Sequence, residues 1–462
     1  MIHHRSQAAR RRAETVEDMD MAIQLSDSFN YGKLIRFALP SVCMTIFTSV
    51  YGIVDGFFIA SFVGKTAFAA VNFIFPVLTM LGAIGLMFGT GGSALVAQTM
   101  GKGDRERAGR LFSLFILFSA LFSLTLALLA FVFLRHIASA LGAEGELLEY
   151  SVLYGRIIVC AVPALVLQTE FQCFFVAAEK PRLGLAVTVA AGLTNFVLDA
   201  LLVWVFPFGL AGAALATAIS QIVGGLVPLL YFTRPNGSPL RLVRSSFDAR
   251  AILVACLNGS SEFMSSVAIS VAGMVYNVQL LRYAGENGVA AYGTMLYVAW
   301  IFSATFMGYG IGVAPVVAYH DGAAHPREVR NILRKSLAVI SAASLMMVVI
   351  SHIFAETLCG IFLGGDGELL ELAWKGFRLY SFCFLFMGFA IFGSAFFTAL
   401  NNGLISALIA VLRTLVFEIG AVLILPLFLG IAGIWLSTVA AEFMAALLTF
   451  FFLLQRNDKR RS

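Results

Sequence analysis

Two aspartates lie deep inside apolar stretches of this sequence, where a charged side chain is costly. Asp55 lies within SVYGIVDGFFIA, and Asp199 lies within TNFVLDALL. An ionised carboxylate at the centre of a membrane-spanning helix costs about 2.5 to 3.5 kcal/mol on insertion scales, and such residues commonly mark ion or proton pathways. The chemistry expected of both residues is therefore the uptake and release of a proton or of a small hard cation.

Other polar groups accompany this pair. Asn195 precedes Asp199 by four residues, which places the amide and the carboxylate on one face of a helix. Thr217 adds a hydroxyl group from the next apolar run, so with Asp55 the four side chains would form a cation-coupling pocket for H⁺ or for transiently bound Na⁺. The alternative is that Asn195 and Asp199 only join helices through hydrogen bonds. Pro40 lies 15 residues before Asp55, and its missing N–H would kink the first helix.

Further ionisable residues lie within apolar runs, and the complete embedded set comprises six acids and two arginines. Besides the two aspartates, the set contains Arg156, Glu170, Glu262, Arg413, Glu418 and Glu442. We expect Glu170, Glu262 and Glu418 to form a secondary acid site or to contact a cationic substrate. The alternative is that the glutamates hold helices together, for example through a pair between Arg413 and Glu418.

The scaffold that holds these residues is predicted to be an all-α integral membrane protein. Of its 462 residues, 60% are hydrophobic and only 12% are charged, and the mean hydropathy is +0.90. Soluble domains carry about 25% charged residues, so this chain has too few to cover a hydrated surface. A membrane-spanning helix needs about 20 apolar residues, and twelve such runs are present. The predicted spans are 34–62, 67–98, 109–134, 147–177, 183–206, 210–232, 251–283, 288–319, 332–355, 372–400, 403–428 and 431–455.

An internal repeat at a constant offset of 221 residues divides the chain into two halves. GLAGAALAT at 209–217 corresponds to GIAGIWLST at 430–438, and Gly64 and Gly101 correspond to Gly285 and Gly322. Six spans per copy is an even number, so both copies enter the bilayer from the same side and form two six-helix bundles. The predicted organisation is a polar cytoplasmic tail (1–30), an N-terminal bundle (31–233), a cytoplasmic connector (234–250), a C-terminal bundle (251–455) and a basic tail (456–462).

Lys and Arg predict the orientation in the membrane. The two tails and the even-numbered connections hold 24 of the 31 basic residues, and the odd-numbered connections hold five. By the positive-inside rule, both termini are expected in the cytoplasm, as in a multi-pass protein of a bacterial plasma membrane. The excess of basic residues is thus a topology signal, and no nucleic-acid partner is expected.

Signatures of catalysis, cofactors and metals were sought without success. Gly64-Lys65-Thr66 resembles the end of a phosphate-binding loop, but Ile59 stands where the first glycine is required. The six cysteines form no CxxC pair, and the histidines near span ends, such as His320, are expected at a solvated surface. We therefore predict no enzyme, no cofactor and no resident metal.

Several motifs resemble the bacterial multidrug and toxic compound extrusion (MATE) transporters. They are the run from Pro40 through VDGFFIASFVGKTAFAAVN, then GTGGSALVAQTMGKGD, NFVLD, GLAGAALAT and GENGVAAYG. The resemblance implies a twelve-helix antiporter, functional as a monomer in the lipid bilayer, that expels amphipathic and often cationic small molecules while H⁺ or Na⁺ moves inward. In members with a cation site in the N-terminal bundle, the kinked helix matches Pro40, and the site matches Asp55, Asn195, Asp199 and Thr217.

The two halves are not chemically equivalent. At the repeat offset, Asp55 corresponds to Tyr276 and Asp199 to Gly420. The NorM-type branch has a C-terminal cation site with acids in helices seven and ten; Glu262 resembles the first only loosely, and the tenth span contains no acid, so no such site is expected. Two other functions stay open. A flippase for lipid-linked sugars would need a basic cavity, and a channel would conduct without a coupled ion.

Overall fold

The computed structural model describes residues 23–363 and 367–459, and every regular element in those residues is helical. Twelve of its helical segments are long and apolar enough to cross a membrane. Each coincides with a predicted span to within a few residues, except that the third ends about six residues later and the ninth and tenth begin about five or six residues earlier than expected. The prediction of an all-α protein with twelve spans is therefore confirmed.

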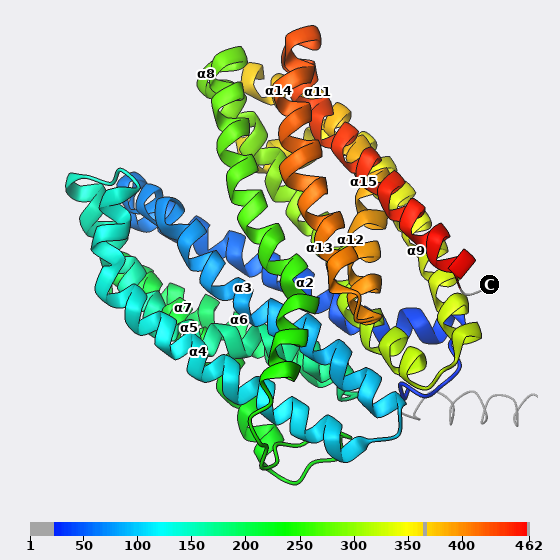
Figure 1. The fold of residues 1–462 in the computed structure, drawn as a ribbon. Helices are drawn as coiled ribbons and strands as arrows, with labels where there is room; N and C mark the ends of the chain where they lie inside the picture. Colours follow the sequence, from blue (N-terminus) through cyan, green and yellow to red (C-terminus); the bar gives the residue numbers. More distant parts are fainter. Residues whose placement is uncertain (1–22, 364–366, 460–462) are drawn as a thin grey trace, which may run out of the picture.

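The first six spans form the N-terminal bundle, drawn in blue to green in Figure 1. Short π-helical segments, η1 and η2, extend the first and fifth spans. The elements are α2 (Tyr31–Phe58), η1 (Ile59–Val63), α3 (Lys65–Gly101), α4 (Arg105–Ala140), α5 (Gly145–Ala177), α6 (Pro181–Asp199), η2 (Ala200–Val205) and α7 (Gly209–Thr233).

The last six spans form the C-terminal bundle, drawn in green to red. Its first two spans form one continuous element, α8, interrupted only at Gly285, where the backbone has φ 61° and ψ −155°. The elements are α8 (Ala249–Gly322), α9 (Pro326–Ile353), α10 (Ala355–Leu363), α11 (Gly367–Tyr380), η3 (Ser381–Cys383), α12 (Phe384–Ala399), α13 (Gly403–Val411), η4 (Leu412–Glu418), α14 (Ile419–Leu429) and α15 (Ile431–Lys459).

The two bundles meet closely at one end of the molecule. This end, where α2 begins and α15 ends, is called the terminal end. A Cβ atom on Gly101 would overlap the carbonyl oxygen of Tyr319, and one on Gly322 would overlap the carbonyl oxygen of Gln98. Both pairs of partners are separated by the repeat offset of 221 residues. The contact is thus symmetric, as expected for two copies related by a two-fold axis along the membrane normal.

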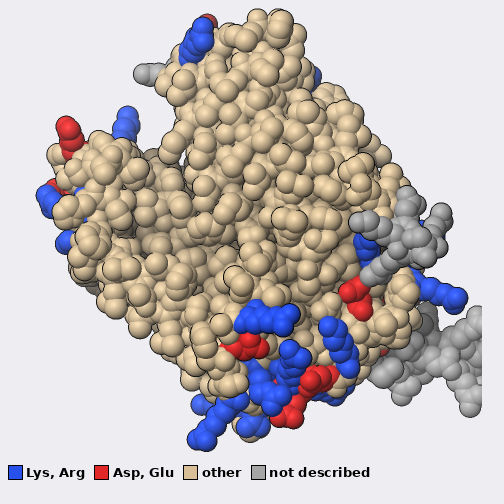
Figure 2. Space-filling model, viewed as in Figure 1, with Lys and Arg blue, Asp and Glu red and all other residues tan. Residues whose placement is uncertain are grey.

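At the opposite end, here called the open end, the bundles diverge (Figure 1). A Cβ atom on Gly273, Gly285 or Gly420 would meet no other atom within 4 Å. The space-filling view shows a hollow between the two lobes at this end and charged side chains gathered toward the ends of the molecule, with a broad uncharged belt between (Figure 2). The molecule is therefore closed at the terminal end and open at the other.

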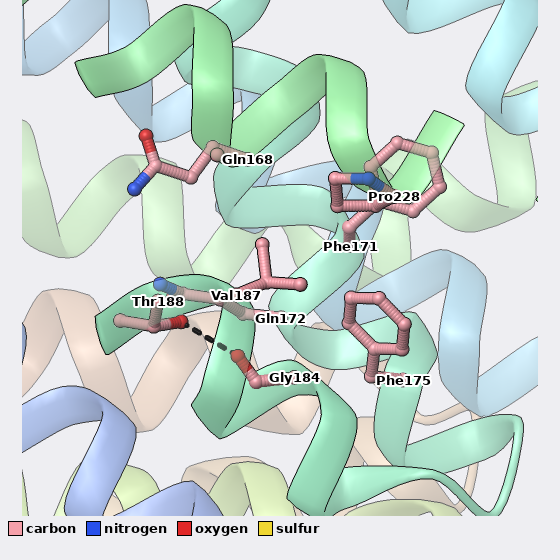
Figure 3. Close-up of a pocket in the computed structure, with 9 residues that line it drawn as sticks. Gln168, Phe171, Gln172, Phe175, Gly184, Val187, Thr188 and Pro228 are labelled. Atoms are coloured by element: carbon pink, nitrogen blue, oxygen red, sulfur yellow. Dashed lines mark hydrogen bonds between the residues drawn. The ribbon is translucent and has the colours of Figure 1, made fainter. Parts of the chain in front are cut away.

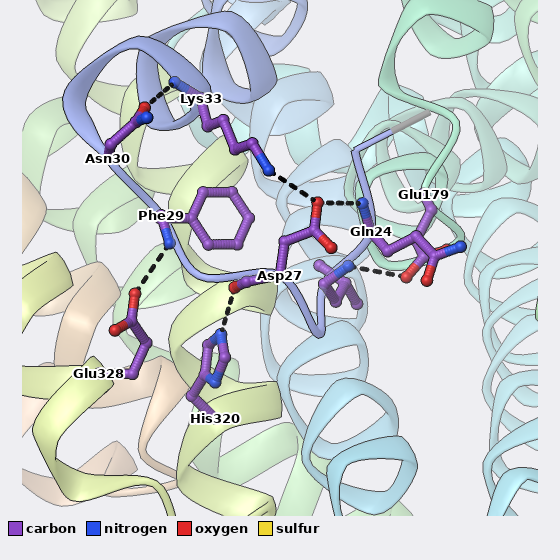
Figure 4. Close-up of polar contacts among 9 residues, drawn as sticks. Gln24, Asp27, Phe29, Asn30, Lys33, Glu179, His320 and Glu328 are labelled. Carbon is purple, nitrogen blue, oxygen red and sulfur yellow. Dashed lines mark hydrogen bonds and ion pairs between the residues drawn. The ribbon is translucent and has the colours of Figure 1, made fainter. Parts of the chain in front are cut away.

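Residues 23–30 lie across the terminal end and contact both bundles (Figure 4). The backbone N–H of Leu25 donates to Glu179 Oε1 of the N-terminal bundle at 2.7 Å. The backbone N–H of Phe29 donates to Glu328 Oε1 of α9 at 2.9 Å. Leu25 and Phe29 are themselves buried, at 0% and 1% exposure. The last part of the expected polar tail is thus a strap that joins the bundles.

His320 differs from expectation, because it is buried rather than solvated. Only 2% of the residue is exposed, and its Nε2 lies 3.1 Å from the backbone oxygen of Asp27 in the strap. The strap covers this end of α8, which the sequence of the span alone does not reveal.

Candidate functional site

The candidate site lies inside the N-terminal bundle, where α2, α6 and α7 meet. Asp55 lies near the end of α2 and Asp199 is the last residue of α6, and a π-helical segment follows each of them closely. A π-helical turn inserts an extra residue into the helix and is common at functional sites. Both carboxylates therefore lie just where their helices depart from regular geometry.

The structure brings all four predicted residues together. The Thr217 hydroxyl donates to Asp55 Oδ1 at 3.3 Å, and Asn195 Nδ2 donates to Thr217 Oγ1 at 3.4 Å. The carboxyl groups of Asp55 and Asp199 are neighbours that interact electrostatically. The polar cluster thus combines side chains of α6 and α7, which follow each other in the chain, with a side chain of α2, which lies far from both in the sequence.

Asp199 is the least satisfied member of this cluster. The residue has 0% exposure, and no donor in the described part of the chain reaches either of its oxygens. Two facing carboxyl groups can form a hydrogen bond to each other only when one of them carries a proton. The pair is therefore suited to hold a shared proton, and its oxygens could also coordinate a small hard cation.

Three polar neighbours of this site were not predicted from the sequence. Tyr154 of α5 is a neighbour of Thr217 and is 4% exposed. Tyr51 lies one helical turn before Asp55, and its phenol is a neighbour of Gln168 of α5. The four-residue spacing between Tyr51 and Asp55 was a usable signal, because it places both on one face of α2. Nothing in the sequence around Tyr154 or Gln168 indicates that they face this site.

Pro40 lies inside α2, which continues through it as a single helix. Five residues later, the Thr45 hydroxyl donates to the backbone oxygen of Ala304 in α8 at 2.7 Å. The first part of α2 is thus attached to the C-terminal bundle, whereas its last part carries Asp55 into the N-terminal bundle. The proline lies in the part attached to α8, and the predicted kink stays a prediction.

Two of the secondary acids lie away from the pair. Glu170 of α5 is fully buried and accepts a short hydrogen bond from the Ser119 hydroxyl of α4. Glu262 of α8 interacts electrostatically with Arg413 of η4 and with Cys173 of α5. Glu170 is thus an interior residue of one bundle, whereas Glu262 lies where the bundles approach each other.

Arg413 pairs with Glu442 of α15, so the predicted pair with Glu418 is wrong. Arg413 Nη2 lies 2.6 Å from Glu442 Oε1, and its Nε also donates to the same carboxylate at 2.9 Å. A bidentate geometry of this kind requires a carboxylate that lies in the guanidinium plane, opposite two of its N–H groups. Glu442 faces Arg413 from the neighbouring helix, whereas Glu418 lies on the same π-helical segment and interacts only through its charge.

The corresponding place in the C-terminal bundle keeps the hydroxyl contact but not the carboxylate pair. Tyr276, the repeat counterpart of Asp55, forms a 2.8 Å hydrogen bond with Thr438, the counterpart of Thr217. The ring of Tyr276 stacks on Tyr292, with ring centroids 4.9 Å apart. A phenol thus occupies the position of the first aspartate, which makes the two bundles chemically different.

Comparisons with known proteins agree with this architecture. A profile of the MatE family matches residues 40–201 and 263–424, two stretches of equal length that follow the internal repeat. The multidrug export protein MepA of Staphylococcus haemolyticus (strain JCSC1435) is 25% identical over 430 residues, which cover 92% of this chain and 94% of that protein. The protein of the same name from Staphylococcus aureus (strain MSSA476) is 24% identical over 432 residues, with the same coverage.

Solved structures share the fold. A MATE protein in complex with MaL6 superposes with a TM-score of 0.90 at 20% identity, covering 96% of this chain and 100% of that one. The outward-facing conformation of a multidrug resistance MATE family transporter of the MOP superfamily also superposes with a TM-score of 0.90, at 21% identity, covering 96% of this chain and 99% of that one.

Proposed function

This chain belongs to the MatE family of membrane transporters, and on that premise we propose that it is an antiporter exporting amphipathic organic cations in exchange for protons. The prediction that it is not an enzyme is confirmed by the family. The relatives are named as multidrug export proteins, which supports a range of drug-like substrates. The single observation that carries the exchange mechanism is Asp199, a buried carboxylate that faces Asp55 and receives no hydrogen bond in the described chain.

The proposed mechanism is competition between the proton and the drug for one carboxylate pair. While the cavity faces outward, Asp55 and Asp199 take up a proton, and the loss of negative charge releases the bound cation. While the cavity faces the cytoplasm, the proton leaves and the negative charge attracts the next cation. With one proton entering for each monovalent cation that leaves, no net charge crosses the membrane, so the pH difference supplies the driving force.

The hydrogen-bond donors around Asp55 and Asp199 favour a proton over Na⁺. Asn195 directs its amide N–H, not its oxygen, toward Thr217, and Thr217 donates its own hydrogen to Asp55. A Na⁺ ion would need these groups to turn their oxygens toward it, because hard cations require oxygen ligands. A shared proton satisfies both carboxylates with the groups as they stand.

The basic residues support the proposed placement in a bacterial plasma membrane with both termini in the cytoplasm. In that orientation the terminal end closes the cytoplasmic side, and the open end faces outward. Both bundles and the whole carboxylate site belong to one chain, which supports function as a monomer.

The two alternative functions find less support. A flippase for lipid-linked sugars would need basic groups for pyrophosphate, but the site in the N-terminal bundle is acidic. A channel would need a path open at both ends, but Gly101 and Gly322 lie in tight contact with the opposite bundle at the terminal end.

The test is the uptake of a fluorescent organic cation into inside-out membrane vesicles under a pH gradient or a Na⁺ gradient applied separately. We expect uptake under the pH gradient alone, and its loss in the Asp199→Asn variant. Glu106→Gln is the matched control, because that side chain is 83% exposed on α4. Uptake driven only by Na⁺ would overturn the proton assignment, and gradient-independent flux would overturn antiport.

A further inference from the structure

A groove lies at the terminal end, where α3 and α4 of the N-terminal bundle meet the start of α8 of the C-terminal bundle. It offers about 590 Å³ to the centre of a water molecule. The cavity between α5, α6 and α7 that Figure 3 shows offers only about 10 Å³, which is room for one water molecule. The groove is thus in the size range of sites that hold organic molecules, about 300 to 1,000 Å³.

Each of the three helices supplies the groove with one basic side chain and one apolar side chain. The basic residues, at most two positions from the end of a membrane-spanning helix, are Lys102, Arg107 and Arg250. The apolar residues, four or seven positions farther into the same helices, are Leu95, Leu111 and Val254. Residues at these spacings lie on one face of a helix. The groove therefore has a basic mouth, formed by the first three residues, and an apolar floor, formed by the other three.

The basic mouth lies close to the boundary of the hydrocarbon layer. On α8, Leu253 and Leu257 follow Arg250 by three and seven residues, and each is 58% exposed. Exposed leucines of a membrane-spanning helix contact lipid chains, and one helical turn rises by about 5.4 Å. Arg250 is thus about one turn from the lipid chains, which is the depth of the phospholipid headgroups.

The positive charges of the mouth are not neutralised by ion pairs within the described chain. No carboxylate oxygen of the described residues lies within 4.0 Å of a side-chain nitrogen of Lys102, Arg107 or Arg250. All three side chains are exposed. They are therefore available to an anionic ligand.

Two acids also line the groove, but each of them caps a helix. Asp104 Oδ1 accepts from the backbone N–H of Arg107 at 2.9 Å, and Asp248 Oδ1 accepts from the backbone N–H of Ala251 at 3.0 Å. Three cations, two acids and the positive N-terminal ends of α4 and α8 leave the mouth with a net positive potential. An anionic group is therefore the expected ligand.

The basic surface continues beyond the groove. Figure 2 shows a cluster of Lys and Arg side chains at the terminal end, where α4 and α8 begin. The connector carries Arg241 and Arg244 along α4, where the backbone N–H of Val243 donates to Ser113 Oγ at 2.8 Å. Clusters of Lys and Arg next to membrane-spanning helices attract anionic headgroups, and basic pockets between such helices bind them.

We propose that this groove binds an anionic phospholipid from the leaflet at the terminal end, with the phosphate at the basic mouth and an acyl chain along the apolar floor. A soluble anion would use the mouth alone, whereas a phospholipid uses both parts of the groove. Because the walls belong to both bundles, the lipid bridges them and stabilises the closed terminal end. The proposal does not depend on the coupling ion.

The first test is native mass spectrometry of the purified full chain in detergent. The protein is titrated with phosphatidylglycerol or with phosphatidylcholine of the same acyl chains. We expect the wild type to bind phosphatidylglycerol at least about tenfold more tightly, because each basic residue near an anionic headgroup contributes roughly fivefold. Equal binding of the two lipids would overturn the proposal.

A matched pair of double variants tests the basic mouth. Lys102→Gln with Arg250→Gln removes one cation of the mouth from each bundle and should weaken phosphatidylglycerol binding at least about tenfold. Arg182→Gln with Arg327→Gln removes the same charge from exposed positions outside the groove, again one in each bundle, and should leave binding unchanged. An equal loss in both double variants would show that only the net charge of the protein matters, which would overturn a defined site.

A second matched pair tests the apolar floor. Val254→Trp fills the floor, whereas Leu253→Trp places the same side chain at the exposed neighbouring residue. Only Val254→Trp should weaken phosphatidylglycerol binding, and added inorganic phosphate should not displace the lipid. Displacement by phosphate, or an unchanged affinity in Val254→Trp, would overturn the lipid assignment in favour of a soluble anion at the mouth.

The bridging role is tested with spin labels at the starts of α4 and α9, on opposite bundles, in nanodiscs with an increasing share of phosphatidylglycerol. We expect the fraction of molecules closed at the terminal end to rise with that share in the wild type and to stay constant in the Lys102→Gln and Arg250→Gln double variant. A wild-type fraction that does not change with the lipid would overturn the bridging role.

Discussion

At the scale of single residues, the buried acids differ chiefly in which hydrogen-bond donor or positive charge each carboxyl group has as a partner. Glu170 accepts a hydrogen bond from Ser119, and Glu442 is held by Arg413. Asp199 has no such donor among the described residues and faces another carboxyl group instead. A group that the protein leaves unsatisfied can exchange its proton without breaking a structural contact, whereas the other two acids cannot.

The first prediction follows from that contrast. Asp199→Asn should abolish proton-driven export, a loss of at least about 100-fold, because proton exchange at the pair is removed. The same change should not lower the melting temperature, because the introduced amide can still donate to Asp55 and no other described donor reaches Asp199. Transport assays and thermal unfolding of the purified variant measure both effects. A clear drop in melting temperature would indicate a structural role for the carboxylate.

The second prediction concerns Glu442. Glu442→Gln should lower the free energy of unfolding by about 3 kcal/mol, because it leaves the Arg413 charge largely buried without its partner. Replacing Arg413 by Met in the same chain should recover part of the loss. Denaturant unfolding in detergent measures both variants. An unchanged free energy in the single variant would contradict a structural role for this ion pair.

At the scale of elements, α2 is the helix that connects the two bundles. Thr45 ties its first part to α8, and Asp55 near its end belongs to the carboxylate pair. A change of charge at Asp55 therefore acts on a helix whose other part is attached to the opposite bundle. This is the physical link by which protonation can alter the contact between bundles.

The third prediction tests the role of Pro40 in that link. Pro40→Ala restores a backbone donor inside α2 and should raise stability, because proline costs about 3 kcal/mol in a helix interior. A stiffer helix should also slow exchange while leaving cation binding unchanged. Parallel measurements of melting temperature, binding and exchange rate check this. An exchange rate equal to that of the wild type would show that α2 need not bend at this residue.

At the scale of the whole molecule, the terminal end is closed by two independent devices. The symmetric contacts of Gly101 and Gly322 bring α3 and α8 together, and the strap of residues 23–30 bridges the bundles above them. Opening this end for the other half of the transport cycle requires both to separate. The strap is therefore part of the conformational equilibrium, although it lies outside the spans.

The fourth prediction uses Glu179, the acid that holds the strap. Its partial burial raises the pKa of the carboxyl group above the ordinary value, and the hydrogen bond from Leu25 offsets only part of that effect. When the strap leaves, Glu179 becomes solvated and the pKa falls. The strapped state therefore binds the proton more tightly, so it is favoured at pH values below the raised pKa and loses that advantage as the pH rises through it.

This pH dependence can be measured by the distance between spin labels on the strap and on α4 across a pH series. We expect the fraction of strapped molecules to increase on acidification in the wild type and to vary less with pH in Glu179→Gln. A wild-type distance that does not change with pH would contradict the prediction.

The sequence alone determined the twelve spans, the repeat and four polar residues that the structure brings together. A segment that crosses the bilayer must satisfy its backbone hydrogen bonds within itself, and it therefore forms a helix. The length of an apolar run in the sequence is thus enough to predict a span. An ionisable residue such as Asp199 is conspicuous in a chain that has so few charges.

Only the tertiary structure decided which helix faces meet. Arg413 pairs with Glu442 instead of Glu418, and His320 is covered by the strap, because helix rotation and tilt are set by packing against neighbours and not by hydropathy. The closed terminal end and the open opposite end likewise depend on contacts between residues more than 200 positions apart in the chain.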